Sequence, residues 1–281
     1  MFSKLLKYDL RAILKYWWIA AVTSLAFGVI AGTSINMLNK FNSTASEMNI
    51  VFYSFPILGI VLSVIGIALF TVVTEVLILV RFYKHLFTDE GYLTFTLPVK
   101  KTQILNSKLL SACIFNAVTV AIVCIDVSIA LIIGFGKSFF TADIWTALSA
   151  TLKEALGFFG AGYMSVVVLE ALLIFVLSAV ASTLLVFVCI TVAAAITRKH
   201  KVLAAIGIYY GVNAVTTGAI QIVMMPTNFY YLADRLLRLN EQAIRPSIVL
   251  ALLMVLGMAV IVCSGLYLLE KYMLDKKLNL E

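Results

Sequence analysis

Hydrophobic positions in this chain gather into six long runs separated by short polar segments. A helix that crosses about 30 Å of hydrocarbon needs roughly 20 apolar residues, because it rises about 1.5 Å per residue. Six runs meet this length, at about 17–37, 55–80, 109–135, 163–196, 202–225 and 248–269. The sequence lacks the alternation of apolar and polar residues that is typical of a membrane β-barrel. We therefore predict an all-α polytopic membrane protein with six transmembrane helices, forming a single transmembrane domain over residues 1–281.

The composition agrees with this prediction. Hydrophobic residues make up 63% of the 281 residues and charged residues only 12%. Soluble domains carry about 25% charged residues. The mean hydropathy is +1.06. These values exclude a water-soluble globular domain.

Lys and Arg lie mostly on one side of the predicted membrane. Cytoplasmic loops are enriched in these residues. If the N-terminus is inside, 15 of the 21 Lys and Arg fall in inner segments and none falls within a span. Both termini are therefore predicted to be cytoplasmic. The net charge of +7 then reflects topology and attraction to anionic lipid, and no nucleic-acid partner is expected.

The first 16 residues combine basic and apolar side chains at helical spacing. The basic ones are Lys4, Lys7, Arg11 and Lys15. The apolar ones fill much of the remaining circumference, at Phe2, Leu5, Leu6, Leu10, Ile13 and Leu14. This pattern predicts an amphipathic helix over 1–16 that lies in the inner interface of the membrane, with Trp17 and Trp18 at the headgroup level. An ordinary basic flank before the first span is the alternative, because Asp9 interrupts the pattern.

The sequence lacks the motifs of catalytic and metal sites. All four cysteines fall inside predicted spans without metal-type spacing, at Cys113, Cys124, Cys189 and Cys263. His85 and His200 fall in predicted cytoplasmic loops. HExxH and GxSxG motifs are absent from the sequence. We expect no enzymatic activity, no metal site and no cofactor bound by this chain.

The predicted cytoplasmic segment between the second and third spans, at about 84–101, is not built like a passive connector. Asp89 and Glu90 precede Gly91, which can end a helix, and Pro98 can start a new one. Apolar bulk lies between them, at Tyr92, Leu93, Phe95 and Leu97. Exposed apolar side chains flanked by charges favour a docking surface. A segment that rests on lipid is the alternative.

A resemblance to a known family rests on two strings in this region, FTDEGYLTFTLPVKK at 87–101 and ILNSKL at 104–109. They resemble permease subunits of ATP-binding-cassette (ABC) transporters of the type 2 exporter class, in particular bacterial members with separate ATPase chains. An interface helix, six spans and inner termini are similar to that family over the whole chain. The resemblance implies a permease of the bacterial cell membrane that forms the substrate pathway of an exporter. It also implies two ABC ATPase subunits as partners, which bind ATP and Mg, and a second permease copy or a related permease.

In that family a coupling helix between spans two and three sits in a cleft of the ATPase. By resemblance, residues 88–98 take this role here. The implied contacts are Asp89, Glu90, Tyr92, Leu93 and Leu97, with Gly91 and Pro98 setting the turn. Closure of two ATPase subunits on nucleotide would then pull these segments together, and rigid spans would carry the motion to the outer face.

Three carboxylates fall within predicted spans, where ionised side chains are costly and tend to face water, substrate or partners. Glu75 lies near the inner boundary, so snorkelling or a bond to a loop Lys explains it. Asp126 and Glu170 have similar depth in the outer half and are placed to line one cavity. One interpretation is a cation-attracting part of the translocation path. Protonated carboxyls bonded to nearby Ser or Thr are the alternative.

Spans one and five carry further small and polar positions. The pairs Gly28/Gly32 and Gly207/Gly211 allow close helix approach. Span five also carries an i, i+4, i+8 polar stripe, at Asn213, Thr217 and Gln221. The stripe lines the translocation path or bonds across helices.

Two other classes of function stay open. A secondary transporter or channel would favour broken spans in matching halves, and the sequence shows no such repeat. A non-transporting membrane scaffold or immunity protein would not need the apolar, charge-flanked inner segment.

Overall fold

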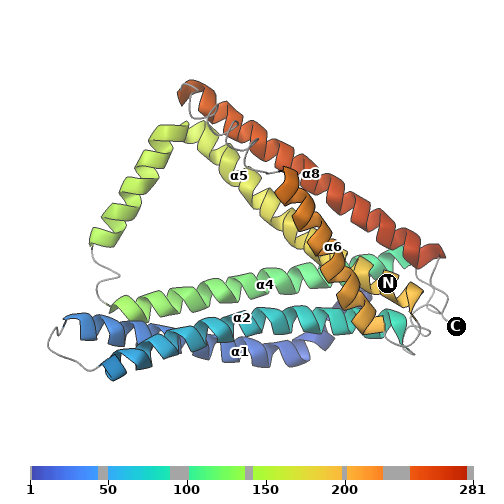
Figure 1. The fold of residues 1–281 in the computed structure, drawn as a ribbon, viewed down its shortest axis with the longest axis horizontal. Coiled ribbons are helices and arrows are strands. Elements are labelled where there is room, and N and C mark those ends of the chain that lie inside the picture. Colours follow the sequence, from blue (N-terminus) through green and yellow to red (C-terminus); the bar gives the residue numbers. More distant parts are fainter. Residues whose placement is uncertain are drawn as a thin grey trace. The chain divides into compact units, whose positions relative to one another are not determined.

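The computed structural model describes residues 2–43, 50–88, 101–136, 142–197, 201–223 and 241–276 (Figure 1). Its long elements within these ranges are all α-helices. They are α1 (Phe2–Ser43), α2 (Ile50–Phe87), α4 (Lys101–Phe135), α5 (Ala142–Ile196), α6 (Lys201–Val223) and α8 (Glu241–Lys276). The predicted all-α class is confirmed for this part of the chain.

Five stretches of these helices are long and apolar enough to cross a membrane. They are Phe2–Phe41, Phe52–Phe87, Lys101–Phe135, Gly162–Ile196 and Pro246–Leu274. Each contains one of the predicted spans, as is typical of a multi-pass membrane protein. α6 covers most of the fifth predicted span, 202–225, and its crossing of the membrane stays a prediction.

α1 is one continuous helix through the predicted interface segment 1–16 and the first span. Its 42 residues give a length of about 63 Å, twice the thickness of the hydrocarbon core. The inner part of α1 therefore extends well beyond the hydrocarbon if the helix stands upright. Its location in the inner interface stays a prediction.

α5 changes direction at Gly160 (Figure 1). This residue has φ 75° and ψ 152°, a backbone conformation that only glycine adopts without strain. The second part of α5 begins where the fourth span is predicted, near Tyr163. The first part contains the segment 142–156, which the sequence places outside the membrane.

The chain forms two compact units. Unit 1 comprises Met1–Phe82 and Asn106–Thr151, and unit 2 comprises Tyr83–Leu105 and Leu152–Glu281. The boundaries fall inside α2, α4 and α5. The ends of α2 and α4 next to the predicted coupling segment thus belong to unit 2, while both helices continue into unit 1.

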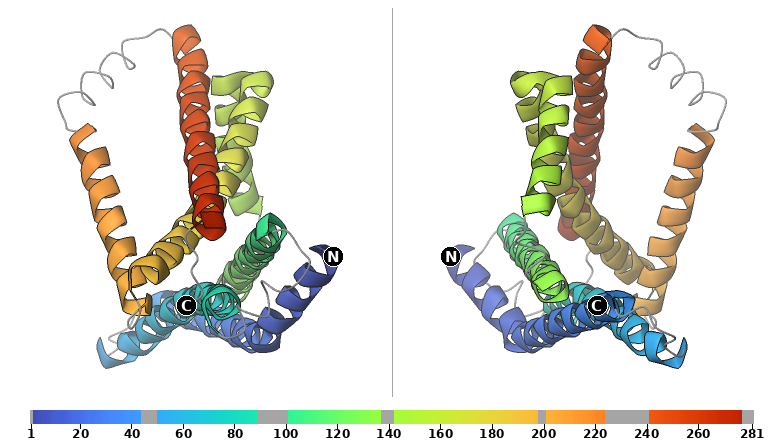
Figure 2. Two further views of the ribbon diagram at one scale, coloured as in Figure 1. Left: turned by 90° about the vertical axis from the view of Figure 1, so that its right-hand side faces the viewer. Right: turned by 90° about the vertical axis from the view of Figure 1, so that its left-hand side faces the viewer.

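In unit 1, α1 lies alongside α2 and α4 (Figure 1 and Figure 2). As residue numbers rise along α1, the residues that it contacts rise in number along α4 and fall in number along α2. From the N-terminal end of α1 onward they include Asp9 with Arg81 and Ser107, Trp17 with Thr74 and Phe115, Asn36 with Ile133, and Phe41 with Tyr53. α1 is therefore parallel to α4 and antiparallel to α2, as three successive spans require for the first and third.

In unit 2, α5 and α8 run side by side (Figure 1). The Sγ atom of Cys263 lies 3.3 Å from the carbonyl oxygen of Leu177, and Thr191 bonds to Glu270 further along both helices. These contacts advance in the same direction, so α5 and α8 are parallel.

Candidate functional site

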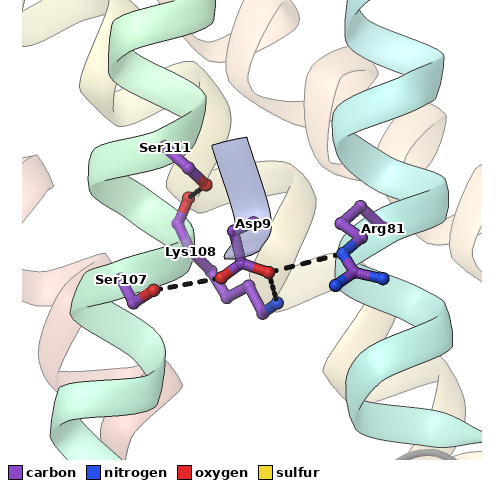
Figure 3. Close-up of polar contacts among 5 residues, drawn as sticks. All are labelled: Asp9, Arg81, Ser107, Lys108 and Ser111. Carbon is purple, nitrogen blue, oxygen red and sulfur yellow. Dashed lines mark hydrogen bonds and ion pairs between the residues drawn. The ribbon is translucent and has the colours of Figure 1, made fainter. Parts of the chain in front are cut away.

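Asp9 is the centre of a buried polar cluster formed by α1, α2 and α4 (Figure 3). Arg81 Nε donates to Asp9 Oδ1 over 3.3 Å, and Ser107 Oγ donates to Asp9 Oδ2 over 3.0 Å. Lys108 Nζ forms an ion pair with the same Oδ1. The side chains of Asp9 and Lys108 are each 4% exposed, and that of Arg81 is 24% exposed. We refer to Asp9, Arg81, Ser107 and Lys108 as the Asp9 cluster.

The helical repeat of α1 places Asp9 on the buried face. Buried residues recur every three or four positions, at Asp9, Ile13, Trp17, Ala21 and Ser24. Side chains three and four positions apart share one side of a helix. The acidic residue that interrupts the basic pattern in the sequence therefore points away from the basic residues and toward α2 and α4.

The same repeat places Trp17 on the buried face. Its side chain is 6% exposed and lies between the rings of Phe70 and Phe115, at centroid distances of 5.8 and 5.4 Å. Its Nε1 atom donates to Thr74 Oγ1 over 3.0 Å. Trp17 is thus a core residue of unit 1, and its place at the headgroup level stays a prediction. Trp18 is 55% exposed, which suits the predicted position.

Electrostatically, the Asp9 cluster joins the N-terminal parts of α1 and α4 to the C-terminal part of α2. Burying a charge is costly unless it is paired and hydrogen-bonded. Here one carboxylate accepts bonds from two cationic groups and a hydroxyl. Arg81 and Lys108 lie on either side of the predicted coupling segment in the sequence. Asp9 therefore joins the N-terminal part of α1 to both helices that carry this segment.

The predicted coupling residues Asp89, Glu90, Gly91, Tyr92, Leu93, Leu97 and Pro98 lie outside the described residues. The structure describes the helix ends on either side of this segment, at residue 88 and from residue 101. Thr88 Oγ1 donates to the carbonyl oxygen of Lys84, within the last turn of α2. At the start of α4, Lys101 Nζ donates to the carbonyl oxygen of Leu274 over 2.9 Å. Leu274 lies in the last turn of α8, where a cation satisfies free carbonyls and complements the helix dipole.

Asp126 is fully buried between α1 and α4. Ser24 Oγ donates to its Oδ2 atom. A Cβ atom added to Gly28 would lie 3.1 Å from the Asp126 Cα atom and 3.2 Å from Oδ1. The bare backbone of Gly28 therefore makes room for this carboxyl group. The geometry is the Ser-bonded arrangement that the sequence leaves open as the alternative to a cation-attracting site.

Glu170 lies on α5 in unit 2 and is 5% exposed. Its Oε2 atom is buried and has no hydrogen-bond partner among the described atoms. Asp126 belongs to unit 1, so the shared cavity of the two carboxylates stays a prediction. The third span carboxylate, Glu75, is exposed and hydrogen-bonds with Asn116 of α4, and its predicted snorkelling or bond to a loop Lys stays a prediction.

The polar stripe of the fifth predicted span lies on α6. Asn213 Nδ2 donates to the carbonyl oxygen of Tyr209 over 2.9 Å, within its own helix. Thr217 and Gln221 are exposed. Lining of a translocation path by these residues stays a prediction.

Sequence reasoning missed Glu270. It is fully buried, and Thr191 Oγ1 donates to its Oε1 atom over 2.7 Å. The predicted sixth span ends one residue earlier, so Glu270 was assigned to the inner segment. The available signal was its spacing, because Glu270 is one heptad after Cys263 and four residues before the buried Leu274.

The described residues hold no group of three or more His, Cys, Asp or Glu side chains placed to bind a metal ion. The Asp9 cluster is an electrostatic junction of α1, α2 and α4. Comparisons of this chain with protein-family models, curated proteins and solved structures found no match.

Proposed function

We propose that this chain is a membrane-spanning permease subunit of an ABC exporter that forms the substrate pathway and couples to separate ATPase subunits. The observation that carries the proposal is the anchoring of both flanks of residues 88–98. Arg81 before the segment and Lys108 after it share the Asp9 carboxylate, and Lys101 holds the last turn of α8. A pull on the segment would thus act on α1, α2, α4 and α8.

Separating the partners of the Asp9 cluster costs more free energy than thermal motion supplies. Removing one partner of a buried ion pair costs about 3–5 kcal/mol, whereas thermal energy is about 0.6 kcal/mol. The inner ends of α1, α2 and α4 therefore move together rather than separately. α4 alone has 35 residues and a length of about 52 Å. Three fastened helices of this length can carry a displacement from one membrane face to the other.

The ATPase partners supply the chemistry in this proposal. Two ABC ATPase subunits bind ATP and Mg and grip residues 88–98 through Asp89, Glu90, Tyr92, Leu93 and Leu97. A second permease, identical or related, completes the pathway. Asp126, Glu170 and the α6 stripe are the candidates for its lining. No residue of this chain needs to be catalytic.

Affinity purification of the tagged full chain from membranes of its own host, in mild detergent, tests the proposal. We expect a co-purified chain with ATPase activity. Charge reversal in the double variant Asp89→Lys/Glu90→Lys should remove this chain from the complex, because the docking surface changes sign. The matched control is Asp143→Lys/Glu154→Lys, which reverses two acidic residues on the segment predicted to be outside and should keep the complex intact.

Three results would overturn the proposal. They are the absence of any ATPase in the complex, its retention by the Asp89/Glu90 variant, and its equal loss from the control variant. Transport by the purified chain alone under an ion gradient would instead identify a secondary transporter.

A further inference from the structure

The first turns of α1 expose a face with charge of a single sign. The exposed side chains along these turns are Ser3, Lys4, Lys7, Tyr8, Arg11, Leu14, Lys15, Tyr16 and Trp18. Asp9 is the only acidic residue before Glu47 in the sequence, and it lies on the opposite, buried face. The exposed face is therefore basic, with aromatic side chains, Ser3 and Leu14 beside the cations and no acidic side chain. We call it the basic face.

We infer that the basic face docks on anionic phospholipid headgroups of the cytoplasmic leaflet. Charge complementarity is the first argument, since four cationic side chains face outward with no acidic residue among them. The aromatic rings are the second argument. Tyr8, Tyr16 and Trp18 are 66%, 59% and 55% exposed, and such amphipathic rings favour the headgroup level of a bilayer.

The position of the basic face along α1 is the third argument. Lys15 lies one helical turn before Trp18 and Ile19, which are exposed residues at the start of the first predicted span. From Lys15 to Lys4 the helix covers about 17 Å. Headgroup layers and a Debye length of about 8 Å together extend over a similar distance. Lys and Arg side chains also reach toward the interface with their long stems.

This docking places lipid and the Asp9 cluster on opposite faces of the same helical turns. Lys7 and Arg11 flank Asp9 in the sequence, and Asp9 bonds to Arg81, Ser107 and Lys108. Bound headgroups thus hold the helix that orients Asp9. The inference does not depend on an ATPase partner, and its test uses none.

The test places an environment-sensitive fluorophore on Tyr8→Cys in the full chain, with the four native cysteines replaced by Ala. The chain is reconstituted in nanodiscs of phosphatidylcholine with a rising fraction of phosphatidylglycerol. We expect a blue shift of the fluorophore, and quenching by brominated lipid, as phosphatidylglycerol increases. The quadruple variant K4Q/K7Q/R11Q/K15Q should lose this response. The variant K4R/K7R/K15R, which keeps every charge, should retain it.

A second set of variants distinguishes an effect of the basic face from an effect of positive charge elsewhere in the chain. Neutralising four other basic residues of the predicted inner segments, Arg198, Lys199, Lys201 and Lys271, should leave the response intact. Each Lys or Arg near an anionic surface changes binding by about fivefold. Single variants K7Q and R11Q should therefore weaken the phosphatidylglycerol response by about fivefold each, which keeps the test valid if the quadruple variant misfolds. A wild-type chain that does not respond to phosphatidylglycerol, or equal losses in both sets of variants, would overturn the inference.

Discussion

Asp9 shares its carboxylate with two cations in a site that is nearly closed to water. We expect Asp9→Ala to lower the free energy of unfolding by about 3–5 kcal/mol, because Lys108 and Arg81 lose the carboxylate that they share while staying largely buried. Chemical denaturation in mild detergent measures this change. The control is Lys7→Ala, an exposed position on the same helix, where a change within about 0.5 kcal/mol is expected.

A double variant distinguishes charge from packing at this site. In Asp9→Ala/Lys108→Met the main buried cation is removed together with its partner. Replacing a buried ion pair by apolar residues is often neutral. The double variant should therefore recover most of the stability that Asp9→Ala loses. If the two losses instead add, the pair contributes little, and the cluster is not the junction described above.

Asp126 gives a second prediction for a single side chain. Its described partner is Ser24, and the residue lies against the bare backbone of Gly28. Asp126→Asn keeps the size of the side chain and an oxygen that accepts from Ser24, so stability should change by less than about 1 kcal/mol. Ser24→Ala should cost about 1 kcal/mol, the usual contribution of one hydrogen bond. A large loss in Asp126→Asn, measured by the same denaturation, would show that the charge itself is needed.

Helix packing gives a prediction from two glycine pairs with the same spacing. A Cβ atom at Gly32 would lie 2.7 Å from Ile133 Cβ, whereas Gly207 and Gly211 have nothing within 4 Å among the described residues. Gly32→Ala should therefore lower stability by about 1–3 kcal/mol through overpacking between α1 and α4. Gly207→Ala should stabilise α6 by up to about 1 kcal/mol, since Ala favours helix over Gly. Thermal unfolding measures both changes. A lower unfolding temperature indicates close helix packing at that glycine, and a higher one indicates open space.

The kink of α5 gives a matched pair of variants within one helix. Gly160 has a φ of 75°, and a side chain there is strained by about 1–3 kcal/mol. Gly157, one turn earlier, lies in regular helix with nothing within 4 Å. We expect Gly160→Ala to lower the unfolding temperature and Gly157→Ala to raise it slightly, by the higher helix propensity of Ala. Equal effects of the two substitutions would mean that α5 straightens without cost.

Hydropathy predicts where these helices lie, but it does not predict which side chains face each other. Each of five predicted spans falls within an apolar helix of the structure, because span length follows from bilayer thickness. The sequence does not predict that Asp9, Trp17 and Glu270 are buried, although all three are. Their burial depends on how each helix is rotated about its own axis, and on partner residues that are distant in the sequence. The cluster of Asp9 with Lys108 joins residues 99 positions apart, which no local pattern reveals.

At the scale of the whole molecule, α2, α4 and α5 each contribute to both compact units. The boundaries in α2 and α4 lie at Phe82 and Leu105, one residue from Arg81 and two from Ser107. The Asp9 cluster thus fastens unit 1 close to the points where the chain passes into unit 2. Lys101 and Leu274 fasten unit 2 on the other side of the same boundary. Motion of residues 88–98 would reach both units through the continuous backbone of α2 and α4, and would not depend on a non-covalent contact.

The orientation of the whole chain depends on α6. Five crossings place the two termini on opposite sides of the membrane, and six place them on the same side. α6 has 23 residues, about 35 Å of helix, which exceeds the 30 Å of hydrocarbon. Its polar side chains are few, and Asn213 bonds within its own helix, so its backbone and this amide need no water. We therefore expect α6 to cross and both termini to be inside.

Labelling of single-cysteine variants in intact and permeabilised cells measures this topology. Ser3→Cys, Thr88→Cys and a cysteine added after Glu281 should react with a membrane-impermeant maleimide only after permeabilisation. Lys153→Cys should react in intact cells, which makes it the matched outer control. Labelling of the C-terminal cysteine in intact cells would mean that α6 does not cross. The tie between Lys101 and the last turn of α8 makes that outcome unfavourable, because it holds the C-terminal end of α8 beside the start of α4 and hence on the side of Thr88.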